Sequence, residues 1–312
     1  MEQTASGGGV EQTARGAGGN GPVRPGVVPH MSSPTLAVTG STGAVGGQVA
    51  RLVADAGREQ RLLVRDVGRA PALHGSVAHP FSYADGAASL TALEGVETLF
   101  MVSGAENEHR LDEHRTFIDA AQVAGVQHVV YTSFLGAAED AKFTLGRDHW
   151  ATEEHLRASG MTWTFLRDSF YADIMTMFAG DEGVIRGPAG DGRVSLVTQA
   201  DVARSAAAVL ADPAAHAGAT YDLTGPEALT FTEIAATVSA ATGRDVTFHD
   251  ETVEEAGASR ASYGAPDWQM AAWVSTYTAI RDGEAAAVSG DVERLTGTRP
   301  ESLAELLART AA

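Results

Sequence analysis

The feature that most constrains the fold is a regular alternation of short apolar segments and longer amphipathic ones between residues 35 and 166. Short segments rich in β-branched residues predict buried strands, whereas a 3.6-residue apolar period predicts helices. Strands that alternate with helices form a parallel sheet with right-handed crossovers and helices on both faces. The alternation therefore predicts an α/β fold built on a doubly wound parallel sheet.

The predicted elements follow this rhythm. Strands are expected at residues 35–39, 61–65, 76–81, 97–102, 127–133 and 162–166, and helices at 43–56, 87–93, 111–124 and 147–158. After residue 166 the rhythm loosens, with helices expected at 169–179, 200–211, 232–242, 267–282 and 300–311 and strands at 194–197, 220–223 and 245–248. We expect residues 33–166 to form the main domain and residues 167–312 a smaller C-terminal α/β part, partly interleaved with the sheet.

The N-terminal segment differs in composition from the rest of the chain. Residues 1–30 hold eight glycines and three prolines, and the tetrapeptide Glu-Gln-Thr-Ala occurs at Glu2 and again at Glu11. Such a segment buries too little apolar area to offset its ordering entropy. We therefore expect residues 1–32 to be a disordered extension, and the segment lacks the basic start and apolar run of a signal peptide.

Composition excludes several classes of function. The 312 residues include no cysteine, so disulfides, thiolate nucleophiles and cysteine metal sites are excluded. A net charge of −18 argues against nucleic acid as a partner. No run approaches the ~18 apolar residues of a membrane helix, so we expect a cytoplasmic protein. His109 and His114 lie five residues apart on a predicted helix and share no face, so no metal site is expected.

A glycine triplet lies between the first predicted strand and the first predicted helix. Ala-Val-Thr-Gly-Ser-Thr-Gly-Ala-Val-Gly spans Ala37 to Gly46. Gly40 permits a tight turn, Gly43 lets a ligand approach the backbone, and Gly46 permits close packing of helix on strand. Free N–H groups and the helix dipole favour a pyrophosphate there, which predicts a Rossmann-type dinucleotide site. The alternative is a structural turn without a ligand.

The second predicted strand ends about twenty residues further on, where a Rossmann fold meets the adenosine ribose. Arg65 comes first there, with Arg69 four residues later, and a guanidinium suits a 2′-phosphate. NADPH is therefore favoured over NADH, although Arg69 is equally explained as a solvated charge. Asp85 follows the third strand and suits either the adenine amino group or a helix N-cap.

Beyond these features the sequence resembles the NmrA-like group of atypical short-chain dehydrogenases/reductases, of the NAD(P)H:quinone oxidoreductase type. The resemblance runs from about residue 36 to 308 and rests on segments 39–47, 129–133, 143–153, 160–167 and 197–203, the last with Asp201 opening a helix. It implies a Rossmann-type fold, a bound NADP cofactor and a C-terminal substrate-binding part.

The chain lacks the proton donor that ordinary members of the superfamily use. Ordinary members use Tyr-x-x-x-Lys, in which lysine lowers the pKa of the tyrosine. Lys142 is the only lysine here, and the resemblance places Leu145 at the tyrosine position and His149 at the lysine position. The resemblance therefore implies a cofactor site without the usual acid for ketone reduction.

An electrophilic, quinone-like acceptor needs mainly positioning against the nicotinamide. We expect His149 to donate a proton near neutral pH or to bind the nicotinamide ribose, with Glu153 orienting its ring. Ser133 ends the fifth strand at the carboxyl edge, where α/β sheets place ligands. The alternatives are packing roles for His149 and Ser133 and a surface charge for Lys142. Tyr131 is expected in the core.

Two groups of bulky side chains in the second half predict a wide apolar pocket for a flat molecule, although each side chain is also explained as core. The pocket residues expected are Phe134, Phe170, Tyr171, Met175, Trp268 and Trp273. The cofactor contacts expected are Gly40, Thr42, Gly43, Ala44, Val45, Gly46, Arg65, Asp85, Ser103 and His149.

The sequence thus predicts an NADPH-dependent oxidoreductase, monomeric or homodimeric, that transfers hydride to a quinone-like or conjugated aromatic molecule. His149 and Ser133 are the expected catalytic residues. Two alternatives stay open. One is a redox-sensing regulator that binds the dinucleotide without turnover. The other is a biosynthetic enzyme that reduces, cyclises or isomerises a pathway intermediate.

Overall fold

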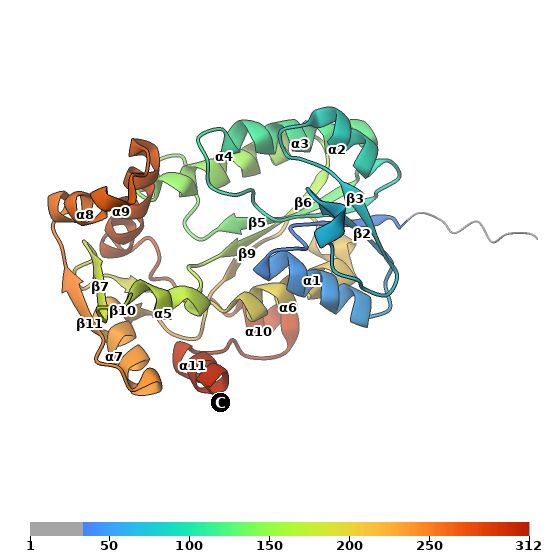
Figure 1. The fold of residues 1–312 in the computed structure, drawn as a ribbon. Helices are drawn as coiled ribbons and strands as arrows, with labels where there is room; N and C mark the ends of the chain where they lie inside the picture. Colours follow the sequence, from blue (N-terminus) through green and yellow to red (C-terminus); the bar gives the residue numbers. More distant parts are fainter. Residues whose placement is uncertain (1–33, 312) are drawn as a thin grey trace, which may run out of the picture. The chain divides into compact units, whose positions relative to one another are not determined.

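The computed structural model describes residues 34–311. The prediction of disorder for residues 1–32 lies outside the described residues. A seven-stranded sheet with the order β3-β2-β1-β4-β5-β6-β9 forms the centre of the fold (Figure 1). Its strands are β1 (Leu36–Thr39), β2 (Gln60–Val64), β3 (Ser76–Pro80), β4 (Thr98–Met101), β5 (His128–Phe134), β6 (Thr162–Asp168) and β9 (Thr220–Leu223).

All neighbouring strands in this sheet are parallel. β1, β2 and most of β5 are buried along their length, as expected for strands covered on both faces. The strand order reverses between β1 and β4. In open α/β sheets, ligands bind outside the carboxyl ends of the strands at such a switch point.

Helices cover both faces of the sheet, as Figure 1 shows. One face carries α1 (Ala44–Asp55), α6 (Gln199–Ala211) and α10 (Asp291–Thr296). The other carries α2 (Gly86–Leu93), α3 (Arg110–Ala124) and α4 (Thr144–Ala158). Each layer buries its own apolar cluster against the sheet, so the fold class is the one that the alternation predicts.

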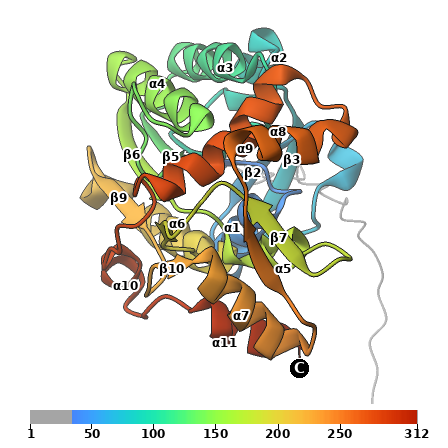
Figure 2. The same ribbon diagram turned by 90° about the vertical axis from the view of Figure 1, so that its left-hand side faces the viewer.

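The remaining elements gather beyond the end of the sheet toward which β5 points (Figures 1 and 2). Two small sheets form there: β7 (Val184–Gly187) pairs with β11 (Thr247–Asp250), and β8 (Arg193–Val194) with β10 (Leu229–Thr230). The longer helices of this part are α7 (Phe231–Thr242), α8 (Val253–Arg260), α9 (Asp267–Arg281) and α11 (Leu303–Ala311). Because β9, α6 and α10 return to the main sheet, the second half of the chain is interleaved with the first.

The helix expected at 169–179 is wrong over much of its length. β6 runs to Asp168, and Tyr171 then forms an isolated parallel bridge with Val197, so the chain stays extended. Only a 3-10 turn, η2 (Ala172–Ile174), and the short α5 (Met175–Phe178) follow. Of the expected strand 194–197, only Val194 lies in a strand, β8. Val197 instead forms the isolated bridge with Tyr171.

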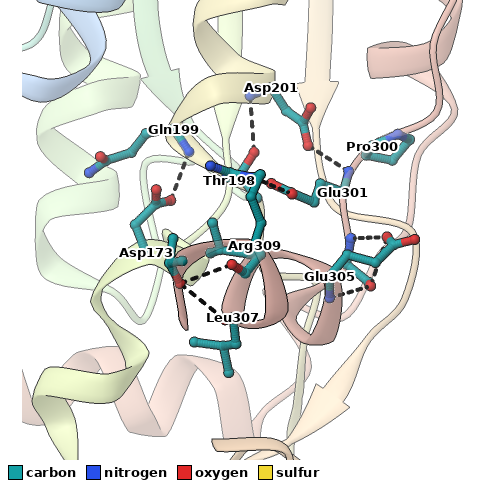
Figure 3. A network of polar contacts seen from close by, with 12 residues as sticks. Asp173, Thr198, Gln199, Asp201, Pro300, Glu301, Glu305, Leu307 and Arg309 are labelled. Atoms are coloured by element: carbon teal, nitrogen blue, oxygen red, sulfur yellow. Dashed lines mark hydrogen bonds and ion pairs between the residues drawn. The ribbon is translucent and has the colours of Figure 1, made fainter. Parts of the chain in front are cut away.

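A polar network ties the C-terminal helix to the start of α6 (Figure 3). Asp201 is buried, and its Oδ2 accepts from the Glu301 backbone N–H at 2.8 Å. The Glu301 carboxylate binds the Arg309 guanidinium through two hydrogen bonds of 2.9 Å. Asp173 in η2 accepts from the Gln199 N–H at 2.8 Å. The first turn of α6 is therefore the point at which η2 and α11 are held.

None of the helices in residues 34–311 combines the length and the hydropathy that a membrane crossing requires.

Asp201→Ala should lower the free energy of unfolding by about 2–3 kcal/mol, because the Glu301 N–H loses its buried acceptor. Glu301→Ala removes only the pair with Arg309, whose side chain is more than half exposed, and should cost about 1 kcal/mol or less. Urea unfolding of the two variants and the wild type measures the difference. Equal losses would contradict the role given to Asp201.

Candidate active site

The glycine loop has the geometry that the sequence predicts. Gly40 has a φ of +65°, which favours glycine, and its carbonyl accepts from the Gly43 N–H at 2.8 Å. A Cβ on Gly46 would lie 2.4 Å from the Gly40 oxygen, so α1 packs on β1 at a distance that only glycine permits. The helix has no side-chain N-cap at Gly43. Its first N–H groups are therefore left for a ligand.

The other loop residues divide between surface and interior. Thr42, Gly43 and Ala44 are exposed, whereas Val45 is buried in the apolar core. Val45 and Gly46 can therefore offer a ligand only their backbone N–H groups. The Ser41 hydroxyl, also in the loop, is buried and has no hydrogen-bond partner within residues 34–311.

A cavity of about 320 Å³ adjoins this loop and is lined by Thr42, Arg65, Asp66 and Arg69. The Asp66 carboxylate accepts from the Gly68 N–H at 2.9 Å, where it caps the 3-10 turn η1 (Val67–Arg69). The lining thus carries two guanidinium groups and one carboxylate. A cavity of this size with two arginines, beside open helix N–H groups, fits the phosphates of NADPH.

Two further residues expected to contact the cofactor, Asp85 and Ser103, form hydrogen bonds within the protein near the edge of the sheet. The Asp85 carboxylate accepts from the Ala88 N–H at 3.0 Å and caps α2, which is the alternative that the sequence left open. The Ser103 N–H donates to Thr132 Oγ1 at 2.9 Å. Contacts of Asp85 and Ser103 with a cofactor stay predictions.

His149 is held in the interior, which corrects the role expected for it. Its Nε2 lies 3.0 Å from Arg110 Nη2 and its Nδ1 lies 3.0 Å from the Tyr131 hydroxyl. A guanidinium only donates, so Nε2 accepts and Nδ1 carries the proton. Burial and the charge of Arg110 lower the pKa of His149 well below its usual value. The ring is therefore neutral and is no proton donor near neutral pH.

Ser133 and Glu153 form a second buried group, which also differs from the expected site. Ser133 is fully buried and its hydroxyl donates to Glu153 Oε1 at 2.6 Å. The Arg167 guanidinium binds both oxygens of Glu153, at 2.8 and 2.6 Å, and Arg157 binds Oε2 at 3.1 Å. Glu153 therefore orients Ser133 and two arginines and not the His149 ring. Ser133 faces α4 because alternate residues of β5 point toward that helix layer, as buried Tyr131 does.

Arg110, which the sequence did not single out, organises the edge of the sheet after β4. Its buried guanidinium donates through Nε to the Gly104 carbonyl at 3.0 Å and through Nη2 to His149. Nη1 lies 3.9 Å from the Asp148 carboxylate and has no hydrogen bond within residues 34–311. His114 Nε2 accepts from the Gly104 N–H at 2.8 Å, and burial with the Arg110 charge lowers the pKa of His114 to about 3.

A larger cavity of about 870 Å³ is lined by residues of α5, β7, α8 and α9 and their neighbouring turns. Its lining includes Met177, Phe178, Tyr263 and Trp273 together with Arg186 and Arg260. Met177 and Tyr263 are 74% and 72% exposed, so large apolar groups face solvent there. Asp181 and Glu182 also line the cavity, so it combines large apolar groups with charged side chains.

The expected pocket residues are divided by the structure. Trp273 lines the cavity, whereas Trp268 is outside its lining and Met175 is packed in the core. The Tyr171 hydroxyl donates to Asp168 Oδ2 at 2.5 Å. Trp268, Met175 and Tyr171 do not line this cavity, and contacts of these three side chains with a substrate stay predictions.

Phe134 and Phe170 lie outside the lining of the cavity, in an aromatic cluster close to the ends of β5 and β6. Their ring centroids are 4.8 Å apart, and Phe143 lies 4.8 Å from Phe134. The cluster packs against Ala272 and the following turn of α9, the helix that carries Trp273. The ends of β5 and β6 are thereby connected to one wall of the cavity. Lys142 lies outside it and pairs with Asp282 at 3.3 Å on the surface.

The chain is similar in sequence to a protein family and to proteins of known activity. Residues 32–257 match the model of the NmrA-like family. Quinone oxidoreductase 2 of Escherichia coli is 35% identical over 239 residues, which cover 74% of this chain and 83% of that protein. An NAD(P)H azoreductase of Xenophilus azovorans is 31% identical over 281 residues, covering 86% of this chain and 96% of the relative.

Solved structures agree with the sequence relatives. The E. coli NADPH-dependent quinone oxidoreductase in complex with NADPH superposes with a TM-score of 0.82 at 32% identity, covering 89% of this chain and 100% of that one. The triphenylmethane reductase of a Citrobacter species, in complex with NADP(H), gives 0.77 at 30% identity with the same coverage. The matched segments include the glycine loop and the strands that carry the site. The chain therefore belongs to the NmrA-like family.

Proposed function

We propose that the chain is an NADPH-dependent oxidoreductase that reduces quinone-like or other conjugated aromatic molecules. The observation that carries the proposal is the cavity of Thr42, Arg65, Asp66 and Arg69 beside the open N-terminus of α1. Two relatives named as a quinone oxidoreductase and a triphenylmethane reductase were solved with NADPH or NADP(H), which supports the same cofactor here.

The chain's own residues account for cofactor binding. The N–H groups that open α1 would hold the pyrophosphate, and Arg65 with Arg69 would hold the 2′-phosphate. The cofactor, when bound, supplies a hydride to the acceptor. Because the strand order reverses between β1 and β4, a dinucleotide spans that point, with its nicotinamide half toward β4 and β5.

The larger cavity is the proposed acceptor site. Trp273 and Tyr263 pack edge to face, with ring centroids 5.9 Å apart, and Phe178 and Met177 add apolar area. Aromatic and methionine side chains adapt to flat molecules and exclude water from them. The azoreductase and the triphenylmethane reductase act, by their names, on extended aromatic molecules, which favours an acceptor of that kind.

The absence of the usual acid limits the acceptor class. Leu145 is buried at the position of the family's tyrosine, and His149 is neutral at that of the lysine. An unactivated ketone needs a strong proton donor to accept hydride, whereas a quinone or a dye cation is electrophilic by itself. The site therefore favours acceptors that gain aromaticity or lose positive charge on reduction.

Arg65→Ala should weaken NADPH binding by about 10–100-fold and leave NADH binding within about twofold, because a charged hydrogen bond to the 2′-phosphate is lost. Titration calorimetry with both cofactors measures the change. Arg51→Ala, an exposed arginine of α1 outside the cavity, is the matched control. An equal loss for both cofactors would contradict the assignment of the 2′-phosphate.

Trp273→Ala should raise KM for a large aromatic acceptor by about tenfold, because a ring that lines the acceptor cavity is lost. Trp268→Ala, on the same helix but outside the lining, should change KM much less. Initial rates across acceptor concentrations at saturating NADPH give both values. The acceptor site lies elsewhere if the two variants behave alike.

The function itself is tested by mixing NADPH with the protein and a panel of quinones and triphenylmethane dyes. Loss of NADPH absorbance together with a reduced product, faster than with NADH, is the expected result. Tight NADPH binding without oxidation by any acceptor would overturn the proposal and favour a regulator that binds the cofactor without turnover.

A further inference from the structure

We propose that the Asp168 carboxyl group is the proton donor for acceptors whose reduced oxygen must be protonated, with Tyr171 as the residue that positions it. The inference rests on the proposed function, because it assigns a residue to that reaction. Asp168 lies at the end of β6. It belongs to none of the motifs named from the sequence, and it is separate from His149 and Ser133.

The place of Asp168 in the sheet is the first argument. It is the last residue of β6 and lies opposite Phe134, the last residue of β5, in the register of the two strands. Carboxyl ends of parallel strands meet at one edge, and β6 is the strand next to β5, on the side away from the glycine loop. Asp168 is thus placed beyond the nicotinamide half of a bound dinucleotide, where the acceptor must approach.

The surroundings of Asp168 are the second argument. Its side chain is 5% exposed, Asp168 pairs in register with Phe134, and the Phe134 ring packs on Phe170 with centroids 4.8 Å apart. Tyr171 donates to Oδ2 at 2.5 Å, so Oδ1 is outside that hydrogen bond. The hydrogen bond from Tyr171 therefore fixes the orientation of the Asp168 carboxyl group at the end of β6.

The charges around Asp168 are few. Burial raises the pKa of Asp168 to about 7, while hydrogen bonds from the Tyr171 hydroxyl and the Asp168 backbone N–H, together with the Arg110 charge, lower it from a still higher value. Arg167 and Asp222, on β6 and β9, occupy positions that alternate with Asp168 and face the opposite side of the sheet. The other charged groups nearby are engaged with one another or with backbone: Asp173 with Gln199, Asp201 with Arg204, and Asp148 with Arg110.

The neighbouring groups are less suited to donate a proton. The pKa of His149 is lowered by burial, so its ring is neutral, and the pKa values of Tyr131 and Tyr171 are raised by burial. Burial raises the pKa of Asp148, while the charge of Arg110, 3.9 Å away, lowers it from a still higher value. Asp168 is the group at this edge whose pKa is raised to about 7.

The step balances for a quinone. The acceptor gains two electrons and one hydrogen as hydride while NADPH is oxidised to NADP⁺. The carboxyl O–H of Asp168 breaks, and its proton forms the new O–H bond on the second carbonyl oxygen. The product is the neutral hydroquinone, and the Asp168 carboxylate regains a proton from water. A cationic triphenylmethane dye differs, because hydride alone converts it to the neutral leuco form and no proton is needed.

This difference gives the test. Wild type, Asp168→Asn and Asp222→Asn are assayed with NADPH against 1,4-naphthoquinone and against crystal violet. Asp168→Asn should lose quinone turnover by about 10²-fold, the lower end of the usual effect of a general acid, and keep dye turnover within about threefold. Asp222→Asn, a matched carboxyl group on the next strand, should keep the wild-type ratio of the two rates.

The pH profile gives an independent measurement. Asp168 is protonated below about pH 7 and ionised above it, so wild-type quinone turnover should fall as pH rises through 7 while dye turnover does not. The falling limb should be absent in Asp168→Asn. In Tyr171→Phe it should move to higher pH, because the hydrogen bond that lowers the pKa of Asp168 is removed.

Three results overturn the inference. An unchanged quinone-to-dye ratio in Asp168→Asn would do so, as would equal loss of both activities, which would make Asp168 a structural or binding residue. A falling limb that persists in Asp168→Asn would assign the proton to another group. A wild-type protein that reduces neither acceptor would instead contradict the proposed function, so the two failures are distinguishable.

Discussion

The close approach of α1 to β1 is the constraint on which the arrangement of the site depends. A Cβ on Gly46 would lie 2.4 Å from the Gly40 oxygen, a distance that side-chain carbons do not occupy. Because no side chain intervenes, the helix begins directly at the carboxyl end of β1, beside the point where the strand order reverses. The helix N–H groups, the arginine cavity after β2 and the ends of β4 to β6 therefore share one edge.

A second constraint acts on the charges at that edge. Arg110 is buried beside two histidines. Burial of the rings, together with the Arg110 charge, lowers the pKa values of His114 and His149, so the two histidines stay neutral and serve as hydrogen-bond acceptors for the backbone N–H of Gly104 and for Arg110 itself. The loop after β4 is fixed in this way by neutral rings. Burial and one cation together thus keep these histidines from serving as acids.

Local pattern predicted the sheet strands and the helices on it, except the short α10, to within a few residues, because parallel strands and their helices carry strong periodic signals. The glycine loop and Arg65 were equally predictable, since backbone geometry and charge at fixed spacing define them. The segment after β6 was not. Tyr171 pairs with Val197, 26 residues later, and nothing local in an apolar, methionine-rich stretch indicates that bridge.

The roles of single side chains were predicted least well. His149 was placed correctly on its helix, but its partners Arg110 and Tyr131 come from α3 and β5. Ser133 was placed correctly at the end of β5, yet Glu153 and Arg167 decide its role. Contacts of this kind join residues 14 to 39 positions apart, and only the packing of three elements fixes them. Asp168 escaped notice because its burial, like theirs, is a property of the tertiary structure.

The replacement of a tyrosine–lysine pair by apolar and neutral residues is consistent with the acceptor class. A ketone must be polarised before hydride reaches it, which a lysine-activated tyrosine achieves. A quinone becomes aromatic on reduction, so its oxygen needs a proton only as charge develops. A phenolic oxygen titrates near 10, above the raised pKa of about 7 for Asp168, so proton transfer from Asp168 to it is favourable. A buried carboxyl group therefore suffices where the acceptor supplies the driving force.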